Sequence, residues 1–325
     1  MRDIRNRLRL AIPALLLALA LAAAAPALAA ENNDPQRFDS AESAVEALAR
    51  AVAGKDRAAL NKIFGARAEA LLGPADDLAA PAEFEAFDRA FNESHELMTT
   101  GDYQTLLLGH DRWPLPIPLA RDGDRWYFDA EAGLDELALR RIGRNELDAM
   151  EVCLAYFDAQ RDYYQLNPEG SAVRHYARSL ISQPGRKDGL FWETHQEGDP
   201  VSPLGELMAL AALQPEAGRL NQPRPYHGYY YKILTGQGPN APGGAWNYLE
   251  DGQMVGGFGL VAYPAEYGVS GIMSFMINQS GRICQKDLGP GGGDQAAWLD
   301  VFDPDSTWTW LDENQESPTQ EAAGS

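Results

Sequence analysis

The side chains with the widest chemical range in this sequence are its histidines. Histidine can bind a metal or transfer a proton near neutral pH. A zinc site needs ligands at short fixed spacings, such as two histidines four residues apart with a glutamate between them, and no pair of histidines here follows that pattern. We therefore predict surface or capping roles for them and no metal site. They are His95, His110, His175, His195 and His227.

Two glycine-containing segments resemble catalytic or phosphate-binding motifs but lack essential residues. Residues 268–271 (GVSG) are too short for the Gly-x-Ser-x-Gly turn that exposes a hydrolase serine. Residues 289–294 (GPGGGD) have no Lys-Ser/Thr ending and finish on an acid, whereas a phosphate-binding loop ends on a cation and a hydroxyl. We predict no catalytic residue and no cofactor-binding residue from either segment.

Acidic residues leave two possibilities open. Asp300, Asp303 and Asp305 are spaced like oxygen ligands of calcium, but Pro304 interrupts the turn that such a loop needs. Paired carboxylates that cleave glycosides come from distant strands and leave no local pattern, and the chain has 47 acids from which to form one. An envelope hydrolase with its site in a cleft between two domains therefore stays an alternative.

Tyrosines and other aromatic residues are concentrated between residues 226 and 267. Alternation along a strand places about half of them in a core. The remainder would form an exposed tyrosine-rich face, a composition common in binding surfaces. We predict the partner surface at Tyr229, Tyr231, Tyr263, Glu266 and Tyr267.

The N-terminal half has the pattern of helices followed by a short antiparallel sheet. Ser40 is a candidate N-cap for the first helix, and an aromatic stripe predicts another helix over residues 82–98. Strands follow at 103–109, 115–120 and 125–129. This order of elements resembles the small cone-shaped domains related to nuclear transport factor 2. Such a cone implies a further alternative, a small-ligand carrier.

The C-terminal half begins with a helix from residue 134, with Gly143 as the expected break. Two adjacent apolar faces predict that this helix is buried between layers. A short helix is expected at 171–181 and an apolar one at 204–213. Four strands should then follow, the last two joined by a hairpin turn at 278–281. They are residues 228–234, 254–263, 271–277 and 282–287.

The N-terminus has the pattern of a cleavable secretory signal peptide. Arg2, Arg5, Arg7 and Arg9 precede an apolar run that ends in the small-x-small sequence 27–29 (ALA), which favours cleavage over a retained membrane anchor. We predict a signal peptide at 1–29, an N-terminal α+β domain at 30–133, a C-terminal helix-plus-sheet domain at 134–311 and a disordered tail at 312–325. The protein should be periplasmic or secreted.

The negative charge of the chain narrows the classes of possible partner. Removing the signal peptide deletes four Arg and one Asp, so the formal net charge changes from -20 to -23. An acidic chain disfavours nucleic acid and anionic lipid as partners.

The chain has two cysteines, Cys153 and Cys284. They would allow one disulfide in an oxidising compartment, or two buried thiols, and the residues alone do not decide between these two states.

Several segments together resemble an exported bacterial family known only as domain of unknown function 2950. The resemblance covers essentially the whole mature chain and implies no activity. The segments are 38–40 (FDS), 141–147 (RIGRNEL), 226–231 (YHGYYY), 262–268 (AYPAEYG) and 285–289 (QKDLG).

The C-terminal half also resembles the globular part of type IV pilins and pseudopilins, in which a helix packs across a small antiparallel sheet. That resemblance implies that Cys153 and Cys284 face each other. Asp158, Arg161 and Asp162 interrupt the helix, so it is unsuited to polymerise as a pilus core.

The sequence therefore predicts an α+β protein in two parts. It favours an exported, non-catalytic envelope protein that binds a protein or polymer and uses no cofactor.

Overall fold

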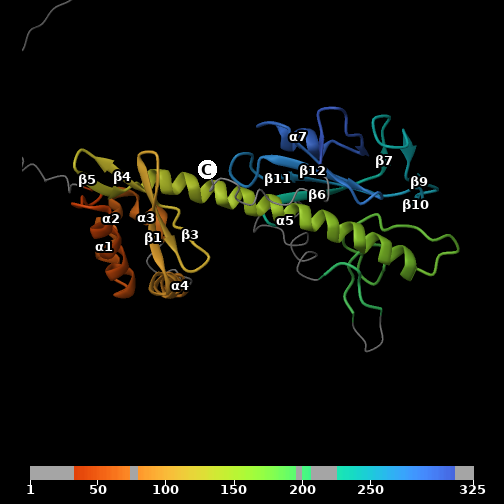
Figure 1. Cartoon of the computed structure of the whole chain (residues 1–325). Coiled ribbons are helices and arrows are strands. Elements are labelled where there is room, and N and C mark those ends of the chain that lie inside the picture. Colours follow the sequence, from red (N-terminus) through yellow and green to blue (C-terminus); the bar gives the residue numbers. More distant parts are fainter. Residues whose placement is uncertain (1–32, 74–79, 195–199, 206–224, 312–325) are drawn as a thin grey trace, which may run out of the picture.

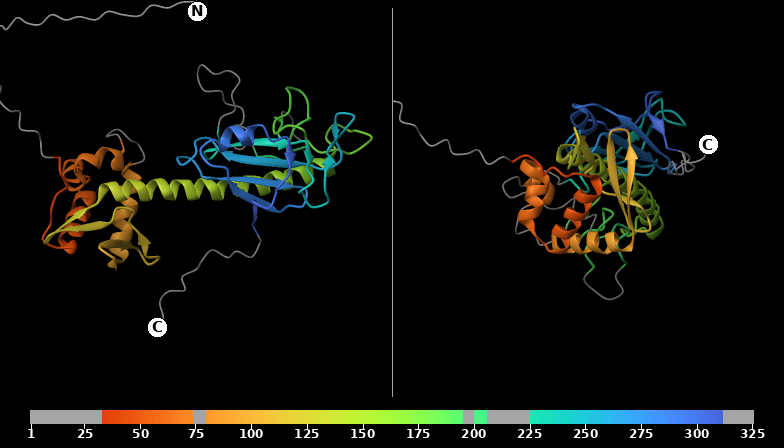
Figure 2. Two further views of the ribbon diagram at one scale, coloured as in Figure 1. Left: turned by 90° about the horizontal axis from the view of Figure 1, so that it is seen from above. Right: turned by 60° about the vertical axis from the view of Figure 1, so that its left-hand side comes forward.

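A computed structural model describes residues 33–73, 80–194, 200–205 and 225–311. The predicted signal peptide, the tail and His195 lie outside these residues, as does most of the helix expected at 204–213. Two units lie at opposite ends of one long helix, α5 (Ala130–Leu166) (Figures 1 and 2). The elements and their pairing confirm the predicted α+β class.

The N-terminal unit packs helices against an antiparallel sheet of order β1-β2-β4-β5, with β3 paired to β2. Ser40 caps α1 as predicted, because its Oγ accepts a hydrogen bond from the Ser43 amide at 3.1 Å. The helices are α1 (Ala41–Ala53), α2 (Arg57–Phe64), η1 (Gly65–Arg67), α3 (Ala68–Leu72) and α4 (Ala80–Glu93). The strands are β1 (His95–Thr100), β2 (Tyr103–Leu108), β3 (Trp113–Pro114), β4 (Leu119–Asp122) and β5 (Arg125–Phe128).

The helix predicted to reach Met98 ends earlier. α4 stops at Glu93, and Met98 lies in β1, where it is opposite Thr105 of β2. The His95 ring stacks on Phe91 with the ring centres 3.8 Å apart, and its Nδ1 lies 3.0 Å from the Phe91 carbonyl oxygen. Pairing with β2 therefore overrides the helical spacing of the apolar residues.

The α5 helix runs through Gly143 without the predicted break. Only one of its two apolar faces is buried, since Leu147 and Leu154 are 60% and 46% exposed. The helix therefore covers one face of the C-terminal sheet, and the prediction that it is buried between layers was wrong.

The C-terminal sheet has the antiparallel order β15-β13-β12-β11-β6. Its inner face packs on α5, and its outer face lies under α7 and β14. Figure 1 shows α7 on the side of the sheet away from α5. A small sheet of order β14-β7-β8 and the hairpin β9-β10 complete this unit. The strands of the main sheet are β6 (Tyr229–Leu234), β11 (Gly259–Pro264), β12 (Met273–Asn278), β13 (Ile283–Asp287) and β15 (Thr309–Trp310). The other elements are β7 (Gly236–Gln237), β8 (Trp246–Asn247), β9 (Leu249–Glu250), β10 (Gln253–Met254), α7 (Gly292–Ala297) and β14 (Val301–Phe302).

Polar side chains of α5 fix its position on this sheet. Glu146 Oε1 accepts hydrogen bonds from the amides of Ile272 at 2.9 Å and Met273 at 3.0 Å. One residue earlier, Asn145 donates to the Ser270 carbonyl at 2.8 Å. Part of the segment 141–147 thus joins the helix to the start of β12. In the region described, no helix is both long and apolar enough to cross a membrane.

Residues 171–181 do not form the predicted helix. They form an extended segment in which Tyr176 bridges Met254 and Ile181 bridges Phe191. The Asn167 residue that ends α5 has a left-handed conformation, with φ 47°, and its side chain bonds both backbone groups of Ser171. This turn directs the chain away from the helix axis.

Candidate functional site

The structure divides the predicted partner surface between two faces of the sheet. Tyr229 is fully buried on the inner face, where its hydroxyl donates to the Met273 carbonyl at 2.9 Å. Tyr231 packs partly buried against the same core. Tyr229 therefore cannot belong to an exposed surface, and this part of the prediction was wrong, while Tyr231 is directed to the inner face and is only partly exposed. Neighbouring residues on a strand point to opposite faces, so Tyr230 lies on the outer face.

The outer face carries a pocket of about 410 Å³, here called the tyrosine pocket. Two of its tyrosines, Tyr263 and Tyr267, were predicted from the sequence, and Tyr230 was not selected. The rings of Tyr230 and Tyr263 are 5.7 Å apart between centres and tilted by 46°. The pocket is lined by Tyr230, Tyr263, Pro264, Ala265, Tyr267, Pro290, Gly291, Gly293, Asp294 and Ala297.

The loop after β11 forms one wall of the tyrosine pocket. Ser270 holds this loop, because its Oγ accepts from the Glu266 amide at 3.0 Å and donates to the Glu266 carbonyl at 3.1 Å. Gly268 has φ 75°, a conformation that side chains disfavour. The predicted surface residue Glu266 is exposed beside this wall but does not line the pocket.

Carboxylates and burial set the electrostatics of the tyrosine pocket. The pKa of Tyr263 is raised by burial, by Tyr230 and by the charge of Asp294. Tyr267 donates its hydroxyl to Asp287 Oδ2 at 3.2 Å, and its pKa is raised by desolvation and by Asp287. Both tyrosines are therefore neutral at physiological pH, with negative charge beside them.

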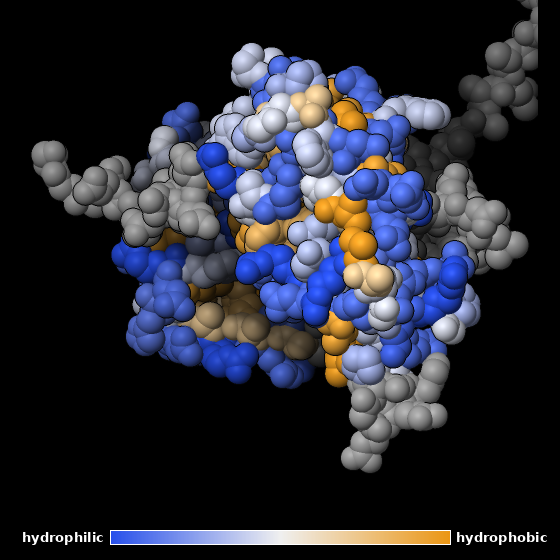
Figure 3. Space-filling view, turned by 90° about the vertical axis from the view of Figure 1, so that its right-hand side faces the viewer, coloured by the Kyte–Doolittle hydropathy of each residue, from blue (hydrophilic) through white to orange (hydrophobic). Residues whose placement is uncertain are grey.

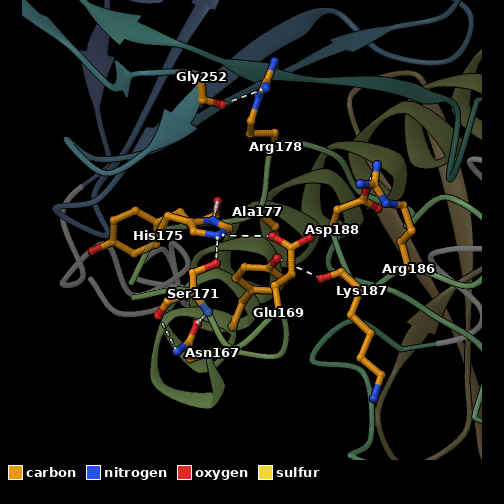
Figure 4. Close-up of polar contacts among 12 residues, drawn as sticks. Asn167, Glu169, Ser171, His175, Ala177, Arg178, Arg186, Lys187, Asp188 and Gly252 are labelled. Carbon is orange, nitrogen blue, oxygen red and sulfur yellow. Dashed lines mark hydrogen bonds and ion pairs between the residues drawn. The ribbon is translucent and has the colours of Figure 1, made fainter. Parts of the chain in front are cut away.

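A second pocket of about 370 Å³ surrounds His175 and is here called the histidine pocket. Figure 4 shows its polar contacts, which come from the end of α5, the segment after it and the β9-β10 turn. Arg178 donates to the Gly252 carbonyl at 2.7 Å. The lining residues are Glu169, His175, Tyr176, Arg178, Ser179, Gln183, Arg186, Asp188, Gly252 and Gln253.

His175 is 8% exposed and has hydrogen-bond partners at both ring nitrogens. Nδ1 lies 3.1 Å from the Tyr176 carbonyl oxygen, which can only accept, so Nδ1 carries a proton. Nε2 faces two oxygens, Ser171 Oγ at 3.1 Å and Glu169 Oε2 at 3.2 Å. An unprotonated Nε2 can accept the Ser171 hydroxyl proton, and a protonated one forms an ion pair with Glu169.

Apart from the spacing of four between Ser171 and His175, no pattern in the sequence indicates this histidine cluster. In the predicted helix that spacing would have placed both side chains on one face. The actual chain is extended, and Glu169 joins the pair only because the turn after α5 folds back. Local periodicity does not reveal such a turn.

The remaining histidines and the aspartates considered as calcium ligands do not form a site in the part of the chain that the structure describes. His227 Nδ1 lies 2.7 Å from Asp148 Oδ2 of α5, and His110 is exposed. Asp300 pairs with Lys232 at 2.8 Å, while Asp303 accepts from Asn240 at 2.8 Å. The described residues contain no group of three or more His, Cys, Asp or Glu that could hold a metal ion.

The two cysteines are free thiols in separate cores. Cys153 lies between α5 and the inner face, whereas Cys284 lies on the outer face. Burial raises the pKa of Cys284 to about 12 and raises that of Cys153 further. Ile283, the neighbour of Cys284, points to the helix, so strand alternation directs the Cys284 sulfur away from it. The arrangement implied by the pilin resemblance, in which the cysteines face each other, is absent.

Hydrophilic residues cover most of the end of the molecule that is on the right in Figure 1, and a broken line of hydrophobic residues crosses it (Figure 3). Leu166 and Val201 are 42% and 79% exposed and line a shallow hollow with Asp162. The surface seen there is predominantly polar, in agreement with the acidic composition.

The family comparison agrees with the sequence resemblance. A family model described as "Protein of unknown function (DUF2950)" matches residues 35–311. No curated protein and no solved structure gives a significant match, so the likeness to pilins stays a prediction. Because the match extends from before α1 to the residue after β15, the chain belongs to the DUF2950 family.

Proposed function

We propose that this protein is an exported, non-catalytic envelope protein that binds a protein or polymer partner at the tyrosine pocket. The observation that carries the proposal is the pocket itself, in which three tyrosines from two strands and a loop surround about 410 Å³. Tyrosine offers a large rigid contact area with a polar end, which is why binding surfaces favour it. The predicted signal peptide supports export.

A site-specific cross-link tests the binding. A photoreactive amino acid replaces Ala265, which lines the pocket and is exposed, and the matched control replaces Ala155, exposed on α5. We expect one discrete adduct at position 265 in the native compartment, lost when Tyr263→Ala is added, and none at position 155. Equal adducts at both positions, or none from a folded and abundant protein, would contradict the proposal.

Export has a separate test. Fractionation should place the mature protein outside the cytoplasm, and sequencing of its N-terminus should begin at Ala30 or Glu31. Retention in the cytoplasm with Met1 intact would contradict export. The cross-linking result would still stand.

A second candidate function, hydrolysis, is favoured by one contact. Ser171 Oγ lies 3.1 Å from His175 Nε2, within the reach of a nucleophile and its general base, and the Tyr176 carbonyl orients the ring. The contact with Glu169 opposes this role, because in a serine–histidine–acid triad the carboxylate binds Nδ1 instead of Nε2.

A fluorophosphonate probe, which labels activated serines, decides between the two candidates. Labelling that is lost in Ser171→Ala and kept in Ser179→Ala would establish the hydrolase, since Ser179 lines the same pocket without contacting the ring. We expect no labelling of the native protein.

A further inference from the structure

We infer that the tyrosine pocket recognises a positively charged ammonium group on its ligand. This inference rests on the proposed function and names the chemistry that the pocket selects. Two observations carry it. Aromatic rings and carboxylates lie together at the pocket, and the lysines on the same face of the sheet contact other protein groups.

The aromatic rings supply the first part of the recognition. Tyr230 and Tyr263 face the pocket from adjacent strands with ring centres 5.7 Å apart, and Tyr267 reaches it from the following loop. The face of an aromatic ring is electronegative and attracts a cation placed over it. The two rings pack against each other with a tilt of 46°, so together they give the pocket an aromatic wall.

Carboxylates supply the second part. Asp294 lines the pocket from the first turn of α7. Among the residues described, its carboxylate has no hydrogen-bond or ion-pair partner, so its charge is available to a ligand. Asp287 does not line the pocket, but it accepts a hydrogen bond from the Tyr267 hydroxyl at 3.2 Å and so adds a second negative charge near it.

The lysines of this face do not neutralise the pocket. Lys232 Nζ donates to the Ala297 carbonyl and to Asp300 Oδ1, both at 2.8 Å. Lys286 lies over the Trp308 ring, with Nζ 6.0 Å from its centre. Because both ammonium groups are engaged beside the pocket, its rings and Asp294 are left for a cation from outside.

Anionic and neutral ligands fit this pocket less well. An anion would approach Asp294 and Asp287 in a chain of net charge -20, with no positive group lining the pocket. A neutral sugar would stack on the rings and donate hydroxyl hydrogen bonds to a carboxylate, but it would lack the charge attraction that an ammonium group gains there. The dependence of binding on ligand charge therefore separates these classes.

The experiment measures binding of small probes to the full-length mature protein by isothermal titration calorimetry. Choline and cadaverine represent quaternary and primary ammonium groups. Their neutral analogues are 3,3-dimethylbutan-1-ol and pentane-1,5-diol. We expect at least one charged probe to bind about tenfold more tightly than its neutral analogue, since a cation over desolvated rings gains that much. The better probe identifies the kind of ammonium group.

Matched variants locate the binding. Asp294→Asn should weaken binding of the charged probe about fivefold, and Tyr263→Ala should weaken it at least about tenfold. Asp251→Asn is the control, because Asp251 is an exposed acid in the β9-β10 turn and does not line the pocket. It removes the same charge and should leave the binding constant unchanged. Circular dichroism of each variant confirms that it is folded.

The outcomes separate this inference from the proposed function. The ammonium inference would be overturned if charged and neutral probes bound equally well, or if no probe bound. It would also be overturned if Asp294→Asn and Asp251→Asn weakened binding of the charged probe equally. A pocket-dependent cross-link found together with that result would leave the proposed function intact. Charge-selective binding without any cross-linked partner would support the inference and contradict the partner proposal.

Discussion

Gln160 offers the sharpest test of how α5 positions the histidine pocket. Its side chain is fully buried and makes three hydrogen bonds. Oε1 accepts from the Ala177 amide at 2.8 Å, while Nε2 donates to the Ala177 carbonyl at 2.8 Å and to the Tyr156 hydroxyl at 3.0 Å. The helix is thereby joined to the extended segment that carries His175.

The change Gln160→Met keeps the side-chain size and removes these bonds. Both backbone groups of Ala177, which is 1% exposed, lose their partner. Each buried polar group left without a hydrogen bond costs about 1–3 kcal/mol. The Tyr156 hydroxyl keeps its hydrogen bond to the Gly259 carbonyl at 3.0 Å, so it contributes little to the loss of stability. We therefore expect the free energy of unfolding to fall by about 2–6 kcal/mol, a large part of a typical total.

Urea denaturation followed by circular dichroism measures this loss, and hydrogen exchange of the Ala177 amide reports whether it is local. The control is Gln165→Met, at an exposed position of the same helix, which should change stability by less than about 0.5 kcal/mol. The reasoning fails if both variants lose the same free energy, or if Ala177 stays protected in Gln160→Met.

Three further predictions concern thiols and glycines. Cys153 and Cys284 should resist thiol reagents in the native protein, because burial raises the pKa of both thiols and keeps them protonated at neutral pH. In urea both thiols should react with the reagent. If neither reacts in urea, the two cysteines form a disulfide and the prediction is wrong. Gly143→Ala should raise the free energy of unfolding by about 0.5–1 kcal/mol, since a Cβ there meets nothing within 4 Å; a loss measured in urea would contradict this. Gly271→Ala should lower it by about 1–3 kcal/mol, because its Cβ would lie 2.6 Å from Cζ of the buried Tyr229; unchanged stability would contradict that packing.

Features with a local cause were predictable from the sequence. Ser40 caps α1 because its hydroxyl reaches an amide three residues away. The hairpin predicted at 278–281 forms between β12 and β13, where Asn278 Oδ1 accepts from the Ser280 amide at 3.0 Å and Gly281 has a left-handed conformation with φ 74°. Both depend on residues close together in the chain, which makes them visible without tertiary information.

The positions of the tyrosines were not predictable in the same way. Alternation requires Tyr229 and Tyr230 to face opposite sides of the sheet, but it does not state which side meets α5. In a sheet with one face exposed to solvent, the polar residues would identify the exposed face and so the face that meets the helix. Here apolar residues line both faces, since α5 covers one and α7 with β14 covers the other.

The sequence by itself determined the α+β class, the family, most of the helices and strands, and the concentration of aromatic residues that contains the pocket. Only the tertiary structure decided that Tyr230, Tyr263 and Asp294 meet on the outer face, and that Glu169 and Ser171 meet at His175. The physical reason is that local hydrogen bonds and periodicity act over a few residues. The packing of α5 and α7 on opposite faces joins segments far apart in the chain, and that packing places the side chains of both pockets.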